Sequence, residues 1–181
     1  MVGSHPAPTP LSSAAKLLLV DGSPPTDVSL YKQAVGSLQY LLCTRPDIAF
    51  VVNKLSQFMH APTQLHWQHV KHLFLYLKGT SHLGLCLASS ATPTLVAFAD
   101  SDWAGNPNDR TSTMAFLIYY GGTLISWKSK KQRSVARSST EAEYRALAHA
   151  TLELLWLQNL LQELHHPVST TPTIYCDNKV L

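Results

Sequence analysis

The chain has 181 residues, 45% of them hydrophobic and 14% charged, enough to bury one good core or one domain and part of a second. Its formal net charge of +3 is too small to indicate a nucleic-acid partner by itself. No apolar run approaches the ~20 residues of a membrane span, no signal peptide opens the chain, and the three cysteines have no paired spacing. We therefore expect a soluble intracellular protein in a reducing compartment, with no disulfide framework and no membrane partner.

The first third of the chain has the pattern of a small helical subdomain. Residues 1–28 are rich in proline and small residues, and we expect a disordered or extended lead-in. Three amphipathic helices with short loops follow in residues 29–80, with Pro46 in the first turn of the second helix and Gly79 at the end of the third. Residues 81–94 form a linker, after which the pattern changes from helices to strands.

Three histidines recur on the third expected helix, at His66, His69 and His72. The first and last of them lie far apart around the helix axis, and no carboxylate accompanies the imidazoles. We therefore interpret these histidines as an ordinary polar face of the helix and not as a metal site.

Residues 95–181 combine short strands with one long helix, which predicts an α/β domain with a mixed sheet. Gly121-Gly122 between two apolar runs is a strong signal for a two-residue hairpin. Ser138 and Glu141 form a capping box at the start of the helix, which continues to about Leu164. The expected strands are 95–100, 115–120, 123–128 and 173–177, and a basic loop over 129–137 precedes the helix.

The first and last of these strands are joined through the long helix. Such a crossover is right-handed and makes the two strands parallel neighbours. Asp100 and Asp177 then emerge at the same edge of the sheet, and the first turns of the helix, which carry Glu143, lean over that edge. Ligands of open α/β sheets bind at the carboxyl ends of the strands, so this edge is the expected site.

The helix offers two acids, and its geometry separates them. At about 100° per residue, Glu141 and Glu143 lie on nearly opposite sides of the helix. The residues that follow Glu143 at helical spacing are apolar, and we expect them to pack against the sheet. Those that follow Glu141, beginning with Arg145, are polar. We therefore assign Glu141 to capping and Glu143 to function.

The first strand also offers two acids. Asp100 and Asp102 share parity with Phe98, so strand alternation does not separate them. Asp100 lies nearer the end of the regular strand, so we favour it and assign Asp102 as an outer ligand. Carboxylates from separate elements repel one another unless a divalent cation lies between them. Asp100, Glu143 and Asp177 therefore predict a magnesium site that handles phosphodiesters.

Several motifs resemble the end of the pol polyprotein of copia-type retrotransposons, and the resemblance runs from about Pro6 to Asn178. Those similar to its ribonuclease H part are Ala99-Asp100-Ser101-Asp102-Trp103-Ala104-Gly105, Ile125-Ser126-Trp127-Lys128-Ser129-Lys130-Lys131-Gln132, Arg137-Ser138-Ser139-Thr140-Glu141-Ala142-Glu143-Tyr144 and Tyr175-Cys176-Asp177-Asn178. Those similar to the thumb-like last part of its reverse transcriptase are Val35-Gly36-Ser37-Leu38-Gln39-Tyr40-Leu41, Thr44-Arg45-Pro46-Asp47-Ile48-Ala49 and Tyr76-Leu77-Lys78-Gly79-Thr80.

The resemblance implies a ribonuclease H-like fold in residues 95–181, in which two Mg²⁺ ions cleave the RNA strand of an RNA–DNA hybrid. Carried over by motif, Asp100, Glu143 and Asp177 are the implied metal ligands. It also implies the remainder of the reverse transcriptase polyprotein as a partner, and a location in cytoplasmic virus-like particles or the nucleus. The candidate contacts to the hybrid backbone are Lys128, Lys130, Lys131, Arg133 and Arg137.

The chain departs from the family pattern in two ways. The polymerase palm with its paired aspartates is absent, so we expect no polymerase activity. The chain also stops at Leu181, before the family's fourth acid and last elements, which implies an impaired second metal position and an incomplete sheet. The alternative to a ribonuclease H module is therefore a truncated, catalytically inactive retroelement remnant that at most binds nucleic acid.

Overall fold

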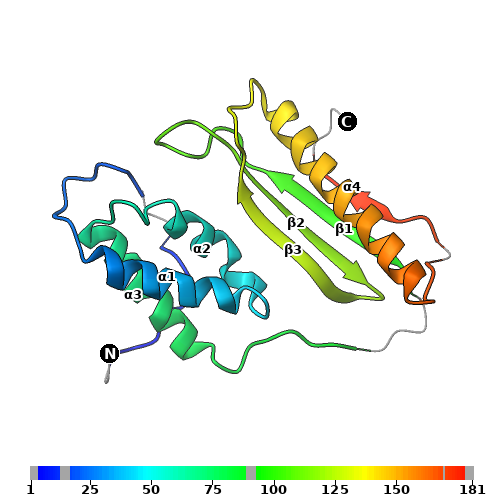
Figure 1. The fold of residues 1–181 in the computed structure, drawn as a ribbon, viewed down its shortest axis with the longest axis horizontal. Helices are drawn as coiled ribbons and strands as arrows, with labels where there is room; N and C mark the ends of the chain where they lie inside the picture. The colour runs from blue at the N-terminus through cyan, green and yellow to red at the C-terminus, as the bar shows by residue number, and fades with distance from the viewer. Residues whose placement is uncertain (1–3, 13–16, 89–92, 169, 178–181) are drawn as a thin grey trace. The chain divides into compact units, whose positions relative to one another are not determined.

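A computed structural model describes residues 4–12, 17–88, 93–168 and 170–177. The chain divides into two compact units, Met1–Leu85 and Cys86–Leu181, and the division falls within the expected linker (Figure 1). Parts of the expected lead-in (1–3 and 13–16) and linker (89–92), together with Asn178 of the last motif, lie outside the described residues. No described helix is long and apolar enough to cross a membrane.

The first unit is built on the predicted helices. Its core gathers Tyr31, Leu38, Leu55 and Leu73, all fully buried, and the Tyr31 hydroxyl donates to the Leu55 carbonyl over 2.9 Å. Asp27 caps the first helix, because its carboxylate accepts the backbone amides two and three residues later. The elements are α1 (Val28–Leu41), the short 3₁₀ helix η1 (Pro46–Ile48), α2 (Ala49–Ser56) and α3 (Gln64–Gly79).

The expected lead-in contacts these helices. Leu17 is 7% exposed and belongs to the helical core, and the Leu18 carbonyl lies 3.0 Å from His66 Nε2. Asp21 accepts a hydrogen bond of 2.6 Å from the Thr63 hydroxyl at the start of α3. These contacts hold the described part of the lead-in against the helical unit.

The prediction that all three histidines of α3 form a polar face is wrong for His66. This side chain is fully buried and stacks on Phe58 with ring centroids 4.0 Å apart. Its Nδ1 accepts the Thr63 backbone amide over 3.1 Å and completes a capping box. Burial lowers the pKa of His66 below its ordinary value, so the ring serves folding as a neutral hydrogen-bonding group.

The second unit contains a four-stranded mixed sheet in the order β3-β2-β1-β4. β1 pairs antiparallel with β2 and parallel with β4, which confirms the predicted parallel neighbours. Gly121 and Gly122, with φ of 55° and 84°, make the predicted hairpin between β2 and β3, where such angles suit glycine. The strands are β1 (Leu95–Ser101), β2 (Thr113–Tyr120), β3 (Thr123–Lys131) and β4 (Thr173–Tyr175).

One face of this sheet is covered by α4 (Ser139–Glu163) (Figure 1). The core between them consists of Leu95, Ala97, Ala99, Phe116, Ile118, Ala150, Leu154 and Leu157. On the opposite face Phe98 is 46% and Tyr175 is 55% exposed, and their rings stack with centroids 5.2 Å apart. Strand alternation therefore gives β1 a buried side toward the helix and an open side that carries Phe98 and Asp100.

The predicted end of the third strand is wrong, because β3 continues three residues beyond Lys128 to Lys131. Lys128 pairs across the ladder with Phe116 and Lys130 pairs with Met114, whose side chains are both buried. Cross-strand partners share a face of the sheet, so the side chains of Lys128 and Lys130 lie on the face that α4 covers. The three lysines are thus strand residues, and the basic loop is shorter than expected.

Candidate metal centre

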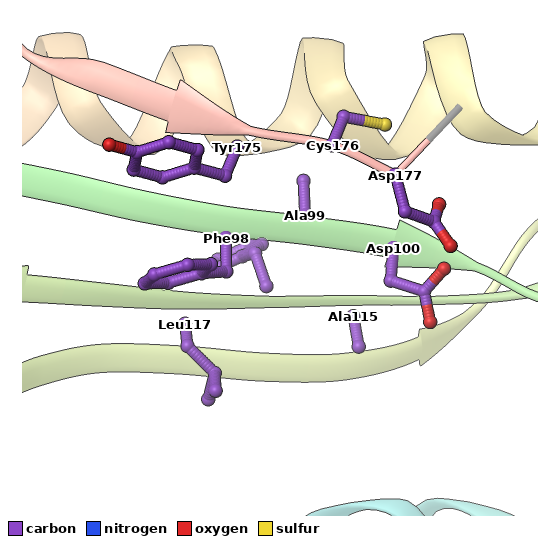
Figure 2. A pocket seen from close by; sticks show the side chains of 9 residues that line it. Phe98, Ala99, Asp100, Ala115, Leu117, Tyr175, Cys176 and Asp177 are labelled. Atoms are coloured by element: carbon purple, nitrogen blue, oxygen red, sulfur yellow. The ribbon is translucent and has the colours of Figure 1, made fainter. Parts of the chain in front are cut away.

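Asp100 and Asp177 lie at the carboxyl ends of two parallel strands. Phe98 of β1 is in register with Tyr175 of β4, so the aspartates two residues further along both strands reach the same level. Both carboxylates are exposed and line a shallow pocket of about 480 Å³. Figure 2 shows them side by side at this edge, beyond the stacked rings of Phe98 and Tyr175. Their position at the carboxyl edge is as predicted.

Glu143 reaches the same edge from the helix. It is 7% exposed and heads the buried face of α4, which continues through Ala146 and Ala150. One carboxylate oxygen accepts the Ser101 backbone amide over 3.3 Å, and the other accepts the Cys176 thiol over 3.4 Å. Glu143 lies on the apolar face of α4 that packs against the sheet, so its carboxylate is buried, as the sequence predicted.

The surroundings of Glu143 favour its neutral form. Burial raises the pKa of its carboxyl above the ordinary value, and the charges of Asp100 and Asp177 raise it further. Hydrogen bonds from Cys176 and Ser101 act in the opposite direction. Among the described residues no lysine or arginine forms an ion pair with Glu143. Three acids therefore gather at this edge, and the ion pairs of the described residues place no lysine or arginine against Glu143.

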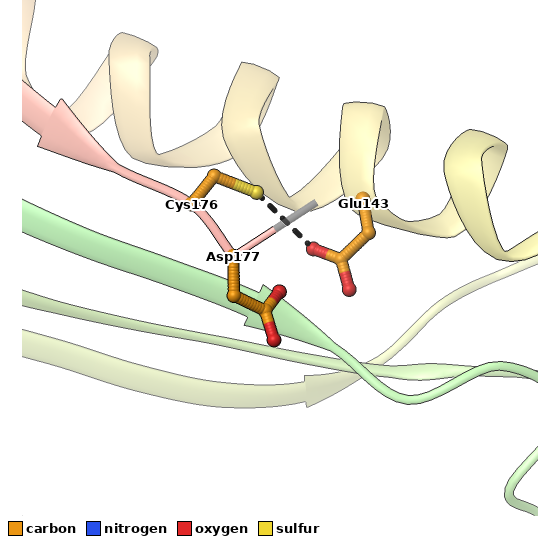
Figure 3. A group of neighbouring side chains, drawn as sticks. All are labelled: Glu143, Cys176 and Asp177. Atoms are coloured by element: carbon orange, nitrogen blue, oxygen red, sulfur yellow. Dashed lines mark hydrogen bonds between the residues drawn. The ribbon is translucent and has the colours of Figure 1, made fainter. Parts of the chain in front are cut away.

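Among the described residues, Glu143, Cys176 and Asp177 form a group of possible metal ligands. One donor atom of each lies within 4.8 Å of the other two (Figure 3). Asp100 is not in this group, although it lines the same pocket as Asp177 and its charge acts on Glu143. Carboxylate oxygens are the ligands that Mg²⁺ prefers, so the acids fit the expected ion.

Asp102 is held within its own loop. Its side chain accepts the Thr113 backbone amide, and its backbone amide donates to the Thr113 carbonyl over 3.1 Å. A Cβ atom on Gly105 would lie against the Asp102 carboxylate. The structure therefore gives Asp102 a role in fixing the loop between β1 and β2, and its role as an outer ligand stays a prediction.

The basic residues differ in what they contact. Lys131 forms an ion pair with Asp109, and the backbone amide of Arg137 donates to Glu141 over 2.7 Å. The side chains of Lys128, Arg133 and Arg137 are exposed and that of Lys130 is half-buried. The five residues are therefore split between β3 and the segment before α4, rather than gathered in one loop.

Sequence reasoning missed Cys176, which contacts Glu143, and Gln132, which contacts Ser101 and Ala142. Cys176 follows Ile174 on the strand side that faces α4, since Ile174 is in register with the buried Ala97. Gln132 is 6% exposed and donates to Ser101 Oγ over 3.1 Å and to the Ala142 carbonyl over 3.0 Å, which joins the end of β3 to the sheet and helix. Alternation along the last strand was the signal that could have identified Cys176.

Comparison with known proteins agrees with the motifs. The chain is 48% identical over 178 residues to the Retrovirus-related Pol polyprotein from transposon RE1 of Arabidopsis thaliana, covering 98% of this chain and 12% of that protein. It is 40% identical over 189 residues to the Pol polyprotein from transposon TNT 1-94 of Nicotiana tabacum, covering 99% of this chain and 14% of that protein.

A shorter relative is the Secreted RxLR effector protein 161 of Plasmopara viticola, 48% identical over 128 residues, which are 70% of this chain and 90% of that protein. No protein-family model and no solved structure matches the chain. The chain spans about an eighth of the length of the transposon polyproteins that it matches, at 12% and 14% of each. The chain is therefore a homologue of the copia-type, retrovirus-related Pol polyproteins of transposons.

Proposed function

We propose that residues 95–181 form a ribonuclease H-like domain that hydrolyses the RNA strand of an RNA–DNA hybrid with Mg²⁺. One observation carries the proposal: acids from three separate elements approach one another at the carboxyl ends of parallel strands, and the most buried of them has no basic partner among the described residues. Such a charge arrangement is costly to folding and is balanced by a bound divalent cation.

In this proposal Asp100, Glu143 and Asp177 hold the metal. Bound there, two Mg²⁺ ions would supply an activated water and charge stabilisation at the leaving oxygen. Glu143 is fixed by Ser101 and Cys176 and gives the site a rigid, water-excluded side. Asp100 and Asp177 face the open pocket, where a phosphodiester can approach. The chain thus positions one buried carboxylate and two accessible ones around the reacting group.

The proposed substrate is bound through its phosphate backbone. Lys128, Arg133 and Arg137 are exposed on β3 and on the segment that leads into α4, within the unit that carries the acids. Lysine and arginine on such a surface bind phosphates and release counterions. The remainder of the Pol polyprotein is the proposed protein partner, and the helical unit is proposed to be the end of its reverse transcriptase.

A cleavage assay on a labelled RNA–DNA hybrid with Mg²⁺ tests this function. We expect the RNA strand to be cut, and Glu143→Gln to lower the rate at least ~100-fold by removing a ligand without changing size. Glu141→Gln is the matched control, because this acid is two residues away and contacts Arg137 and Arg145. Hybrid binding without cleavage at any Mg²⁺ concentration would favour the inactive-remnant alternative.

A further inference from the structure

We propose that Glu143, Cys176 and Asp177 form a binding site for a thiophilic divalent cation such as Zn²⁺ or Cd²⁺, in which the Cys176 sulfur is a direct ligand. The three residues come from two elements, α4 and the end of β4, and one donor atom of each lies within 4.8 Å of the others (Figure 3). The proposal concerns cation binding alone and stands whether or not the domain hydrolyses RNA.

The spacing of the Cys176 and Glu143 donor atoms fits shared coordination. Cys176 Sγ and a Glu143 carboxylate oxygen are 3.4 Å apart. In a tetrahedral zinc site, sulfur at about 2.3 Å and oxygen at about 2.0 Å from the ion are separated by about 3.5 Å. A cation can therefore replace the proton between these two atoms, and a donor atom of Asp177 lies within 4.8 Å of those of the other two residues.

Burial and charge also fit a cation. Glu143 is 7% exposed and forms no ion pair with a lysine or arginine in the described part of the chain. Cys176 is half-buried and Asp177 is exposed, so the group is closed on the helix side and open on the pocket side. Three protein ligands beside an open position are typical of zinc sites that accept water or a further ligand.

The sulfur determines which cations this site prefers. Magnesium takes oxygen ligands, whereas a thiolate selects zinc and other soft ions. Glu143 and Asp177 are also proposed ligands of Mg²⁺, so a thiophilic ion bound through Cys176 occupies part of the same site. We therefore expect Zn²⁺ or Cd²⁺ to compete with Mg²⁺ for this edge of the sheet.

The test is a titration of the full chain with Cd²⁺ in the absence of nucleic acid, followed by the ultraviolet charge-transfer absorbance of a cadmium–thiolate bond. We expect a saturable signal that Cys176→Ser abolishes. The double variant with Cys43→Ser and Cys86→Ser is the matched control, because both of these cysteines are exposed and neither belongs to the ligand group. We expect this variant to keep the full signal.

Two further measurements fix the ligand set and the fold. Glu143→Gln is expected to weaken Cd²⁺ binding at least ~10-fold, which is the lower end of what a lost supporting group costs a metal site. The circular dichroism spectra of all variants should match that of the original chain. An absent signal in the original chain, or an unchanged one in a folded Cys176→Ser variant, would overturn the proposal. Neither result bears on cleavage in Mg²⁺, which is measured separately.

Discussion

Glu143 lies at the top of the buried face of α4, among alanines and leucines whose packing against the sheet holds the helix in place. Its hydrogen bonds to Ser101 and Cys176 satisfy both carboxylate oxygens, yet burial and the nearby aspartates still raise its pKa. A glutamine of the same shape could accept the same amide without the charge. Packing therefore does not require the charge of Glu143, and the proposed cation accounts for it.

A pH dependence of stability follows from the raised pKa of Glu143. As the pH rises above the ordinary value of 4.5, the unfolded chain loses this proton first, so the free energy of unfolding falls until the folded carboxyl has also ionised. Glu143→Gln removes this loss. We expect the variant to melt at a higher temperature than the original chain near neutral pH, with the difference vanishing below the ordinary pKa. Equal differences at both pH values would contradict the assignment.

Gly105 has a steric role in the loop after β1. A Cβ at this position would collide with the Asp102 carboxylate, which also accepts the Thr113 amide. Gly105→Ala is expected to cost about 1–3 kcal/mol of stability and to speed hydrogen exchange at the Thr113 amide. Gly84→Ala is the control, since nothing lies within 4 Å of a Cβ there. If hydrogen exchange at the Thr113 amide is unchanged in Gly105→Ala, the loop accommodates the added methyl group without loss of stability.

At the scale of elements, α4 begins at a specific cap. Ser138 Oγ accepts the Glu141 backbone amide over 3.1 Å, while the Glu141 carboxylate pairs with Arg145 and accepts the Arg137 amide. Ser138→Ala is expected to lower the free energy of unfolding by about 1 kcal/mol, measured by urea denaturation. Ser139→Ala, one residue further on in the first turn, is the matched control and should cost less. Equal losses of stability in Ser138→Ala and Ser139→Ala would contradict the assignment of Ser138 as the cap.

The extension of β3 gives a prediction about nucleic-acid binding. Lys128 and Arg133 are exposed, whereas Lys131 is engaged by Asp109. Lys128→Ala and Arg133→Ala are each expected to reduce the salt dependence of hybrid affinity by about one phosphate contact, seen as a shallower slope of log K against log salt. Lys131→Ala should change the slope less. If all three slopes equal that of the original chain, the hybrid binds elsewhere.

The sequence predicted those elements whose signals are local and periodic. Gly121-Gly122 identified the hairpin, and helical spacing separated Glu143 from Glu141. The end of β3 was missed because lysines do not favour strands, while ladder pairing with β2 holds them there. The role of Cys176 was missed because it depends on a hydrogen bond to Glu143, which lies 33 positions away in the chain.

At the scale of the whole molecule, the chain is two units with separate cores, one helical and one built on a sheet. In the first unit Arg45 binds both Asp47 and Thr80, and Asp47 also accepts the Tyr76 hydroxyl over 2.9 Å. These contacts tie η1 to the end of α3 without any residue of the second unit. The helical unit therefore contains its own long-range contacts.

We expect the helical unit to fold without the rest of the chain. Residues 1–85, expressed alone, are expected to keep the helical circular dichroism signal of α1 to α3 and to unfold cooperatively on heating. The buried core around Tyr31 and Leu55 lies entirely within this segment. Arg45→Met should weaken that transition because it removes the positive charge that pairs with Asp47. A segment without helical signal would show that the unit depends on the rest of the chain.

The proposed function requires a cation shared by acids that are distant in the sequence. Titration calorimetry with Mg²⁺, on the full chain without nucleic acid, measures this directly. We predict saturable binding by the original chain and by Glu141→Gln, and an affinity at least ~10-fold lower for Glu143→Gln and Asp177→Asn. Binding that is equally tight in all four proteins, or absent from the original chain, would contradict the account.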